Sequence, residues 1–366
     1  MDASAPMSDA PPPSDRPDAS GTGHPTVRAL KAAGRVVNHT LFKLGLAVAI
    51  MSALYFTGSI DFRKLKPQSW NWVGASVLLV LPSFFISSLR FKVLLGGLEL
   101  PCSLGRAVLW TMIGEFWNVA TPGTGGDLMK MLYVAQAYGK GRRGVAALCV
   151  LLDRIMGLWG LLCFGLLACL LGGETIAADP RLVHVRDILL AICSGSLLVL
   201  ALLASPWARR SALRQKLMGK LPFPEKFEKI YQGFSSLSQK PGLILATLAL
   251  SVLNHAVWCV SVLALAQGMG LHFDLSAGMV VIPIALFINV FGFAGGFGFG
   301  EFAFENLFVE LLSQPAGAGG ALAFAFHILA LLLRITVAGP FYIFGGRKSG
   351  GGELETSERS TVNGER

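Results

Sequence analysis

Long runs of apolar residues, separated by short polar segments, dominate the chain. A helix that crosses a lipid bilayer needs about 20 predominantly apolar residues. Runs of suitable length occupy residues 41–58, 72–89, 144–171, 188–205, 242–268 and 319–345. We therefore predict an all-α integral membrane protein in which about six helices cross the membrane completely.

Two other apolar regions, 104–138 and 276–312, contain glycines and a charged residue where a span would be continuous. Irregular backbone is tolerated at membrane depth only where it is buried in protein or lines a wet cavity. We predict that each region is a Gly-broken re-entrant hairpin that returns to its side of entry, so that the two form a pseudo-inverted repeat. The alternative is that both regions cross completely, which gives about eight spans.

The composition supports a membrane location, because only 14% of the 366 residues are charged. Soluble globular chains contain about 25% charged residues. With a mean hydropathy of +0.59, the chain cannot cover a water-facing surface, which excludes a soluble enzyme, a nucleic-acid binder and a disordered scaffold. Lys and Arg concentrate at the ends of apolar runs, as the positive-inside rule requires. The six cysteines form no Cys-x-x-Cys pair and lie mostly inside apolar runs, so we predict neither a disulfide framework nor a metal site.

The chain divides into a membrane domain and two polar tails. Residues 1–27 are rich in Pro, Ser, Asp and Gly and lack the features of a signal peptide, so we predict a disordered cytoplasmic tail. The polytopic membrane domain spans 28–345, and residues 346–366 are predicted as a second disordered cytoplasmic tail. Within the domain, 206–240 is a basic cytoplasmic connection, either an interfacial helix on an anionic leaflet or a solvated loop.

Basic residues also predict the orientation of the chain in the membrane. Arg28, Lys31 and Arg35 precede the first apolar run, which places the N-terminus in the cytoplasm. The basic residues that we assign to segments between spans include Arg90, Lys92 and Arg106 on the cytoplasmic side and Arg181 and Arg186 on the external side.

The first interruption carries a set of residues suited to an anionic headgroup: Asn118, Pro122, Gly125, Gly126, Asp127 and Lys130. Proline removes a backbone donor and glycine weakens a helix, so an unbroken span is disfavoured here. Asp127 is placed to cap a new helix, whose first amides, with Lys130 one turn later, can meet a phosphate. Because no Gly-Lys-Ser/Thr follows, the pattern is not a nucleotide-binding P-loop.

The second interruption has a similar design, in which a glycine cluster is followed by one acid and an apolar half-helix. Its candidate residues are Gly295, Gly296 and Glu301. In transporters, discontinuous helices of this kind meet near the midplane and form the substrate site. The alternative is that the glycines only allow close packing of helices. Packing alone, however, does not require an acid beside each cluster.

Three ionisable residues, Asp153, Arg154 and Arg334, lie well inside predicted spans. Placing an ionisable group at such depth in the membrane costs free energy, so a functional role or a pairing partner is the default expectation. We select Arg154 and Arg334 as ligands of a phosphate headgroup, because a planar guanidinium binds phosphate through two hydrogen bonds. The alternative is that each arginine only pairs with an acid and holds the helices together, the candidate acids being Asp153, Asp127 and Glu301. Further polar side chains in apolar surroundings are Glu115, Asn254, His255, Asn289 and His327.

Together these residues resemble the flippase-like membrane domain of the lysylphosphatidylglycerol synthases, in its stand-alone form. The resemblance covers about residues 40–345 and rests on Asn118–Lys130, Asp153-Arg154, Gly295–Glu301, Arg334 and the basic stretch Arg90-Phe91-Lys92. It implies a multi-pass protein of the bacterial inner membrane that moves a lipid with a polar headgroup between leaflets.

The chain departs from the family pattern in three respects. Lys130 stands where the family usually has arginine, which weakens the case for bidentate recognition at that position. Phe291 and Ala294 stand where prolines are common in the family, so the second break is expected to be gentler. The soluble aminoacyltransferase domain of the full-length synthases has no counterpart in the sequence. We therefore expect no transfer of lysine to a lipid.

Our leading hypothesis is that the protein flips or scrambles a phospholipid, a polyprenyl-linked glycolipid or a hopanoid-type lipid. No ATP-binding motif is present, so transport is predicted to be passive or ion-driven, with Asp127, Asp153 and Glu301 as candidate proton carriers. The same acids suit general bases or metal ligands of a membrane-embedded transferase acting on a lipid phosphate. A third hypothesis is a non-transporting scaffold that binds lipid-synthesis enzymes. We predict no bound cofactor and no nucleic-acid partner.

Overall fold

The structure is a computed structural model, and the residues that it describes are 52–53, 55–58, 60–120, 125–139, 142–205, 237, 239–289 and 298–345. All of them belong to one compact unit, Leu46–Arg366. Within these residues the regular elements are all helical, as predicted. The predicted tails, 1–27 and 346–366, and most of the basic connection, 206–240, lie outside the described residues.

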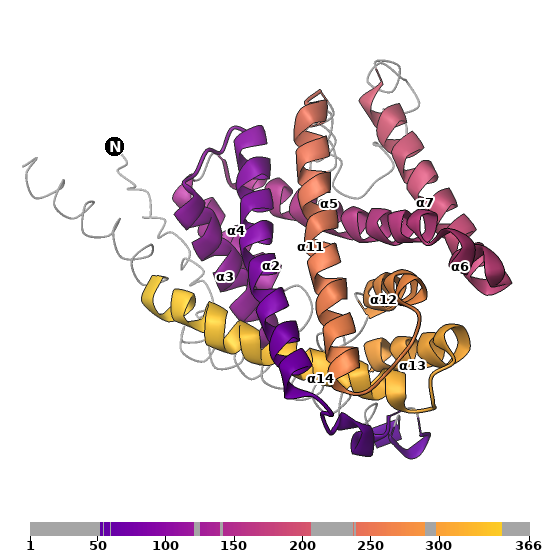
Figure 1. The fold of residues 1–366 in the computed structure, drawn as a ribbon. Helices are drawn as coiled ribbons and strands as arrows, with labels where there is room; N and C mark the ends of the chain where they lie inside the picture. Colours follow the sequence, from indigo (N-terminus) through magenta and orange to yellow (C-terminus); the bar gives the residue numbers. More distant parts are fainter. Residues whose placement is uncertain are drawn as a thin grey trace, which may run out of the picture. The chain divides into compact units, whose positions relative to one another are not determined.

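Five long helices have the length and apolar composition of membrane spans (Figure 1). They are α2 (Trp70–Gly97), α5 (Arg143–Leu171), α7 (Pro180–Ala204), α11 (Pro241–Gly268) and α14 (Ala318–Leu333), the last extended by two π-helical turns, η4 (Arg334–Ala338) and η5 (Phe341–Gly345). These five helices cover the predicted spans 72–89, 144–171, 188–205, 242–268 and 319–345, whereas most of the first run, 41–58, lies outside the described residues. The protein is therefore an all-α, multi-pass membrane protein.

Helix α2 extends beyond the apolar run that predicted it. The run ends before Arg90, and the positive-inside rule assigned Arg90 and Lys92 to a cytoplasmic segment. In the structure the helix continues to Gly97, and Arg90 is only 8% exposed. The predicted end of the span was wrong, because an acid on another helix pairs with Arg90 and makes its burial tolerable. The cytoplasmic side of this helix end stays a prediction.

Helix α7 begins earlier than predicted, at Pro180. Asp179 caps its N-terminus by accepting a hydrogen bond from the backbone N–H of Arg181, and proline suits the first helical position. Arg181 and Arg186 therefore belong to the helix and not to the predicted external loop. Large apolar side chains cover its outward face, which suits contact with lipid: Ile188, Leu190, Leu197, Leu198 and Leu202.

Each of the two interrupted regions contains a pair of short helices. They are α3 (Leu104–Ala120) with α4 (Gly125–Ala137), and α12 (Leu275–Asn289) with α13 (Phe299–Leu312), and the members of each pair pack against each other. None of the four reaches the roughly 20 residues that a complete span needs. On a straight helix Gly114 and Gly126 would lie about 18 Å apart. Because Gly126 instead lies directly against the carbonyl oxygen of Gly114, the chain reverses direction between them.

The order of elements repeats along the chain. One long helix, two short helices and another long helix occur first as α2–α3–α4–α5 and again as α11–α12–α13–α14 (Figure 1). Helices α2 and α11 pack along each other, α12 packs on α5, and α3 packs on the π-helical end of α14. The short first helix of each half therefore contacts the last helix of the other half. Polar side chains from both halves are thereby brought together.

Two clusters of buried apolar side chains hold these helices together. The larger cluster joins the first half of α2 and the second half of α11 to α12, α13 and α14. The smaller cluster joins the second half of α2 to α3, α4 and the start of α5. The polar site described next is lined by these helices except α13, so apolar packing fixes the backbone that carries its charged groups.

Candidate functional site

A polar cavity of about 330 Å³, partly open to the outside, lies among seven of the helices. Its walls come from α2, α3, α4 and α5 in the first half of the chain and from α11, α12 and α14 with its π-helical extension in the second. The predicted site residues that it brings together are Asn118, Asp127, Lys130, Asp153, Arg154 and Arg334. Residues more than two hundred positions apart therefore share one cavity, as the sequence hypothesis required.

The most buried charged group of the cavity is a triad of Arg90, Lys130 and Asp153. Arg90 Nε donates to Asp153 Oδ1 at 2.8 Å, and Lys130 Nζ donates to Asp153 Oδ2 at 2.8 Å. The three residues are between 5% and 8% exposed and come from α2, α4 and α5. Two cations share one carboxylate, so the triad carries one excess positive charge at a buried position.

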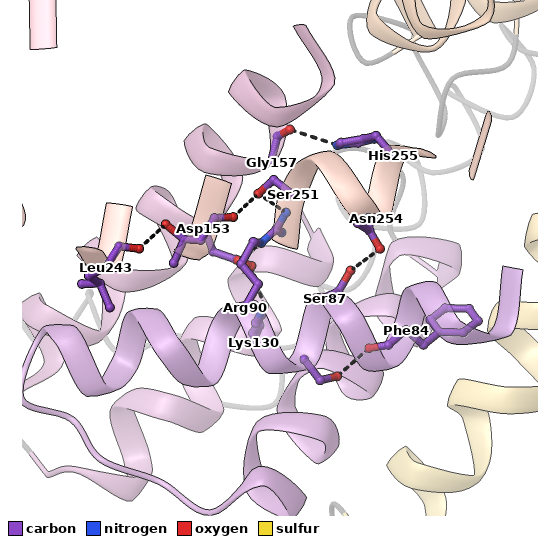
Figure 2. A network of polar contacts seen from close by, with 12 residues as sticks. Phe84, Ser87, Arg90, Lys130, Asp153, Gly157, Leu243, Ser251, Asn254 and His255 are labelled. Atoms are coloured by element: carbon purple, nitrogen blue, oxygen red, sulfur yellow. Dashed lines mark hydrogen bonds and ion pairs between the residues drawn. The ribbon is translucent and has the colours of Figure 1, made fainter. Parts of the chain in front are cut away.

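Neighbouring groups orient the cations of the triad. Arg90 Nη1 donates to Ser251 Oγ on α11 at 3.1 Å, and Figure 2 shows Arg90 between Asp153 and Ser251. The ammonium of Lys130 lies 3.5 Å from the centroid of the Phe91 ring, a cation–π contact. These contacts fix the positions of both cations. Because a serine hydroxyl and an aromatic ring are uncharged, they do not neutralise the excess positive charge of the triad.

Two further ion pairs line the cavity in more exposed positions. Arg154 Nη1 lies 3.4 Å from Asp127 Oδ2, and the arginine side chain is 45% exposed. Arg334 Nε donates to Glu115 Oε2 at 2.9 Å, and its side chain is 30% exposed. Arg154 thus pairs with one of the acids that the alternative named, Asp127, whereas Arg334 pairs with Glu115, which it did not name. Each arginine nevertheless uses one N–H group in its pair and stays accessible from the cavity, so pairing and phosphate binding are compatible.

Glu301 belongs to a second polar group, behind the cavity wall. Its carboxylate is fully buried, accepts a hydrogen bond from the backbone N–H of Gly298 at 2.6 Å, and contacts His327 Nδ1 at 2.8 Å. His327 Nε2 in turn lies 3.0 Å from Asn289 Nδ2. Asn289 and His327 line the cavity, whereas Glu301 does not. Glu301 therefore reaches the cavity only through His327.

The two short-helix pairs share one local design. The amide oxygen of Asn118, near the end of α3, lies against Gly126 in the first turn of α4. That of Asn289, at the end of α12, lies against Gly300 in the first turn of α13. Both oxygens are buried and accept no hydrogen bond from the described residues. Among the predicted residues of the two interruptions, Pro122, Gly295 and Gly296 lie outside the described residues.

Substitution of Gly126 by alanine is expected to destabilise the protein by about 1–3 kcal/mol, the usual effect of overpacking a tight contact. A Cβ atom at Gly126 would collide with the Gly114 carbonyl oxygen and the Asn118 amide oxygen. Gly105→Ala on α3 is the matched control, because its new Cβ meets no atom within 4 Å. Thermal unfolding in detergent compares the two variants, and equal melting temperatures would contradict the close approach.

Sequence reasoning missed Arg90 and Ser251 and gave no role to Glu115. The signal for Arg90 was present, because apolar residues continue after Lys92 and could extend the span. Nothing local marks Glu115 as the partner of Arg334, which lies 219 positions away. Among the described residues, no group of three or more His, Cys, Asp or Glu side chains is arranged to hold a metal ion.

Comparison with known proteins agrees with the resemblance noted in the sequence. A family model described as "Lysylphosphatidylglycerol synthase TM region" matches residues 41–338, which is most of the chain and includes every charged residue of the cavity. No curated protein and no solved structure matches the chain. The family match concerns the membrane region, so it agrees with the helical fold and with a lipid-related role.

Proposed function

Because the chain belongs to the lysylphosphatidylglycerol synthase TM region family, we propose that the protein flips or scrambles a lipid with a polar or phosphate headgroup across the inner membrane. The observation that carries the proposal is the polar cavity, where cations from both halves of the chain surround one space. A headgroup that crosses an apolar bilayer unaided loses its hydration. The cavity would replace that hydration with guanidinium and ammonium groups.

Arg154 and Arg334 are proposed to contact the phosphate directly. Each keeps N–H groups that its single carboxylate contact does not use, and guanidinium groups bind phosphate in a bidentate manner. Asp127 and Glu115 would keep the arginines in place through the paired N–H groups while the unused N–H groups bind the headgroup.

The short-helix pairs α3–α4 and α12–α13 are proposed to be re-entrant hairpins that enter from opposite sides of the membrane. Their helices are too short to cross it alone, and the repeated order of elements fits an inverted repeat. With the N-terminus in the cytoplasm, as the basic residues predict, the two hairpins would meet near the midplane. The cavity would then open alternately toward each leaflet as the halves rock against each other.

Movement of protons is proposed as a means of driving transport if the lipid moves against its gradient. Asp127, which lies beside Arg154, and Glu301, which contacts His327, are the proposed proton carriers. Asp153 already holds two cations and fits a fixed counterion better than a proton carrier. No chemical conversion of the lipid is proposed, and lipid-synthesis enzymes are the expected partners that supply or consume it.

Reconstitution into liposomes tests the proposal. Fluorescent lipids in the inner leaflet are expected to become accessible to an external quencher faster than in empty liposomes. Arg154→Ala combined with Arg334→Ala should slow this by about tenfold or more, since a hydrogen bond to a charged group contributes about 1.5–3 kcal/mol. Arg186→Ala is the control, because Arg186 lies outside the cavity on α7. No acceleration for phospholipid, polyprenyl-linked or hopanoid-type lipids would refute translocation.

A further inference from the structure

The charges that line the cavity do not cancel. Among the described residues of its wall, the cations are Arg90, Lys130, Arg154 and Arg334, and the anions are Glu115, Asp127 and Asp153. With neutral histidines the cavity therefore carries a net charge of +1. The excess lies on the Arg90–Asp153–Lys130 triad, because the other two arginines each have one acid of their own.

The acids of the cavity are already engaged. Asp153 accepts hydrogen bonds from two cations at 2.8 Å, Glu115 accepts one from Arg334 at 2.9 Å, and Asp127 lies 3.4 Å from Arg154. An ammonium group that enters the cavity would have to displace an arginine or lysine from one of these carboxylates. A phosphate needs no such displacement, because it binds N–H groups that the carboxylates leave unused.

We propose that the cavity selects lipids whose headgroup carries a net negative charge and rejects zwitterionic and cationic headgroups. This inference rests on the proposed function and names its substrate class. A phosphodiester with an uncharged alcohol, such as phosphoglycerol, neutralises the +1 of the cavity. A phosphocholine or phosphoethanolamine headgroup is zwitterionic, so it leaves the net charge of the cavity at +1. It also places an ammonium group among the four cations of the cavity wall. An aminoacylated phosphoglycerol with net positive charge raises the total further.

The selectivity should follow the net charge of the cavity. Lys130→Gln lowers the net charge from +1 to zero while Arg90 keeps Asp153 paired, and Glu115→Gln raises it to +2. Lys92→Gln is the matched control, because Lys92 follows Arg90 by two positions on α2 but does not line the cavity. Coulomb interactions at a few ångströms in a partly hydrated site are large enough for roughly tenfold changes per charge.

The experiment measures translocation of three fluorescent lipids by the full chain in liposomes of one composition: phosphatidylglycerol, phosphatidylcholine and lysyl-phosphatidylglycerol. Wild type is expected to move phosphatidylglycerol roughly tenfold faster than either of the others. The ratio of the phosphatidylglycerol rate to the rate of either other lipid should fall with Lys130→Gln, rise with Glu115→Gln and stay unchanged with Lys92→Gln. Melting temperatures in detergent show that each variant is folded, and Glu115→Gln decides the question if Lys130→Gln does not fold.

The outcomes separate this inference from the proposed function. If no lipid moves faster than in empty liposomes, translocation itself is wrong. If all three lipids move at equal rates, or if lysyl-phosphatidylglycerol moves fastest, translocation stands and the selection of net negative headgroups is overturned. A ratio that responds equally to Lys92→Gln and Lys130→Gln would also overturn it, because the effect would then come from the surface potential and not from the cavity.

Discussion

Asp153→Asn is expected to lower the free energy of unfolding by about 3–5 kcal/mol, the usual cost of breaking a buried ion pair. Arg90 and Lys130, which are 8% and 5% exposed, would then lie beside a neutral amide with no counterion in the triad. Thermal unfolding in detergent and the yield of monodisperse protein on gel filtration measure the effect. Most of the variant should aggregate.

Asp187→Asn is the matched control for this variant. Asp187 pairs with Arg186 on α7, but its side chain is 56% exposed, and surface changes of this kind usually stay within about 0.5 kcal/mol. Combining Asp153→Asn with Lys130→Gln restores the wild-type charge of the triad and should recover part of the lost stability. If the single variants Asp153→Asn and Asp187→Asn had the same melting temperature, the triad would not stabilise the structure.

Glu301→Ala is expected to destabilise the protein by about 3 kcal/mol, because it removes the acceptor of two buried hydrogen bonds to a charged group. The Gly298 N–H and His327 Nδ1 would both lose their contact with the carboxylate. Glu301→Gln keeps the volume and one acceptor oxygen, so its loss of stability should be smaller. Chemical unfolding followed by intrinsic fluorescence compares the two variants.

Glu310→Ala serves as the control on the same helix, because the Glu310 side chain is 71% exposed. If Glu301 acts only in stability, Glu301→Gln should translocate lipid at the wild-type rate with the same dependence on a pH gradient. If it also carries protons, Glu301→Gln should translocate lipid but lose that dependence. If Glu301→Ala and Glu310→Ala had the same free energy of unfolding, this would contradict the buried contacts of Glu301.

The long helices were predictable because a membrane span is defined by its length and composition alone. The charged positions Asp127, Arg154 and Arg334 were also predictable, since an ionisable residue in an apolar run is rarely there without a partner or a role. Their partners were not. Whether Arg334 meets Glu115 or Glu301 depends on how α14 packs on α3, and this contact has no local signature in the sequence.

Arg90 and Glu301 show two ways in which local reasoning failed. Arg90 follows an apolar run that looks complete, so the charge rule assigned it to a loop, yet Asp153 and Ser251 draw it into the helix bundle. Glu301 was expected to bind the substrate, but its carboxylate turns back to the backbone of its own helix start and to His327. In both cases tertiary pairing decided where the charge lies.

Glu305 was not noticed in the sequence, although it has a defined structural task. Its carboxylate accepts hydrogen bonds from the backbone N–H groups of Gly317 at 2.5 Å and Gly320 at 3.0 Å, at the start of α14. A carboxylate at a helix N-terminus satisfies donors that have no partner within the helix. Because this cap comes from another helix, no capping motif near residue 317 reveals it.

The distribution of the ion pairs along the chain sets an order for biogenesis. A ribosome completes Arg90, Lys130 and Asp153 within the first 153 residues, so the triad can assemble while the rest is still being translated. Of the charged residues that line the cavity, Arg334 is synthesised last, and until then Glu115 lacks the guanidinium with which it pairs. Insertion of α14 would thus complete the cavity, and chains truncated before Arg334 should leave the Glu115 carboxylate without its counterion.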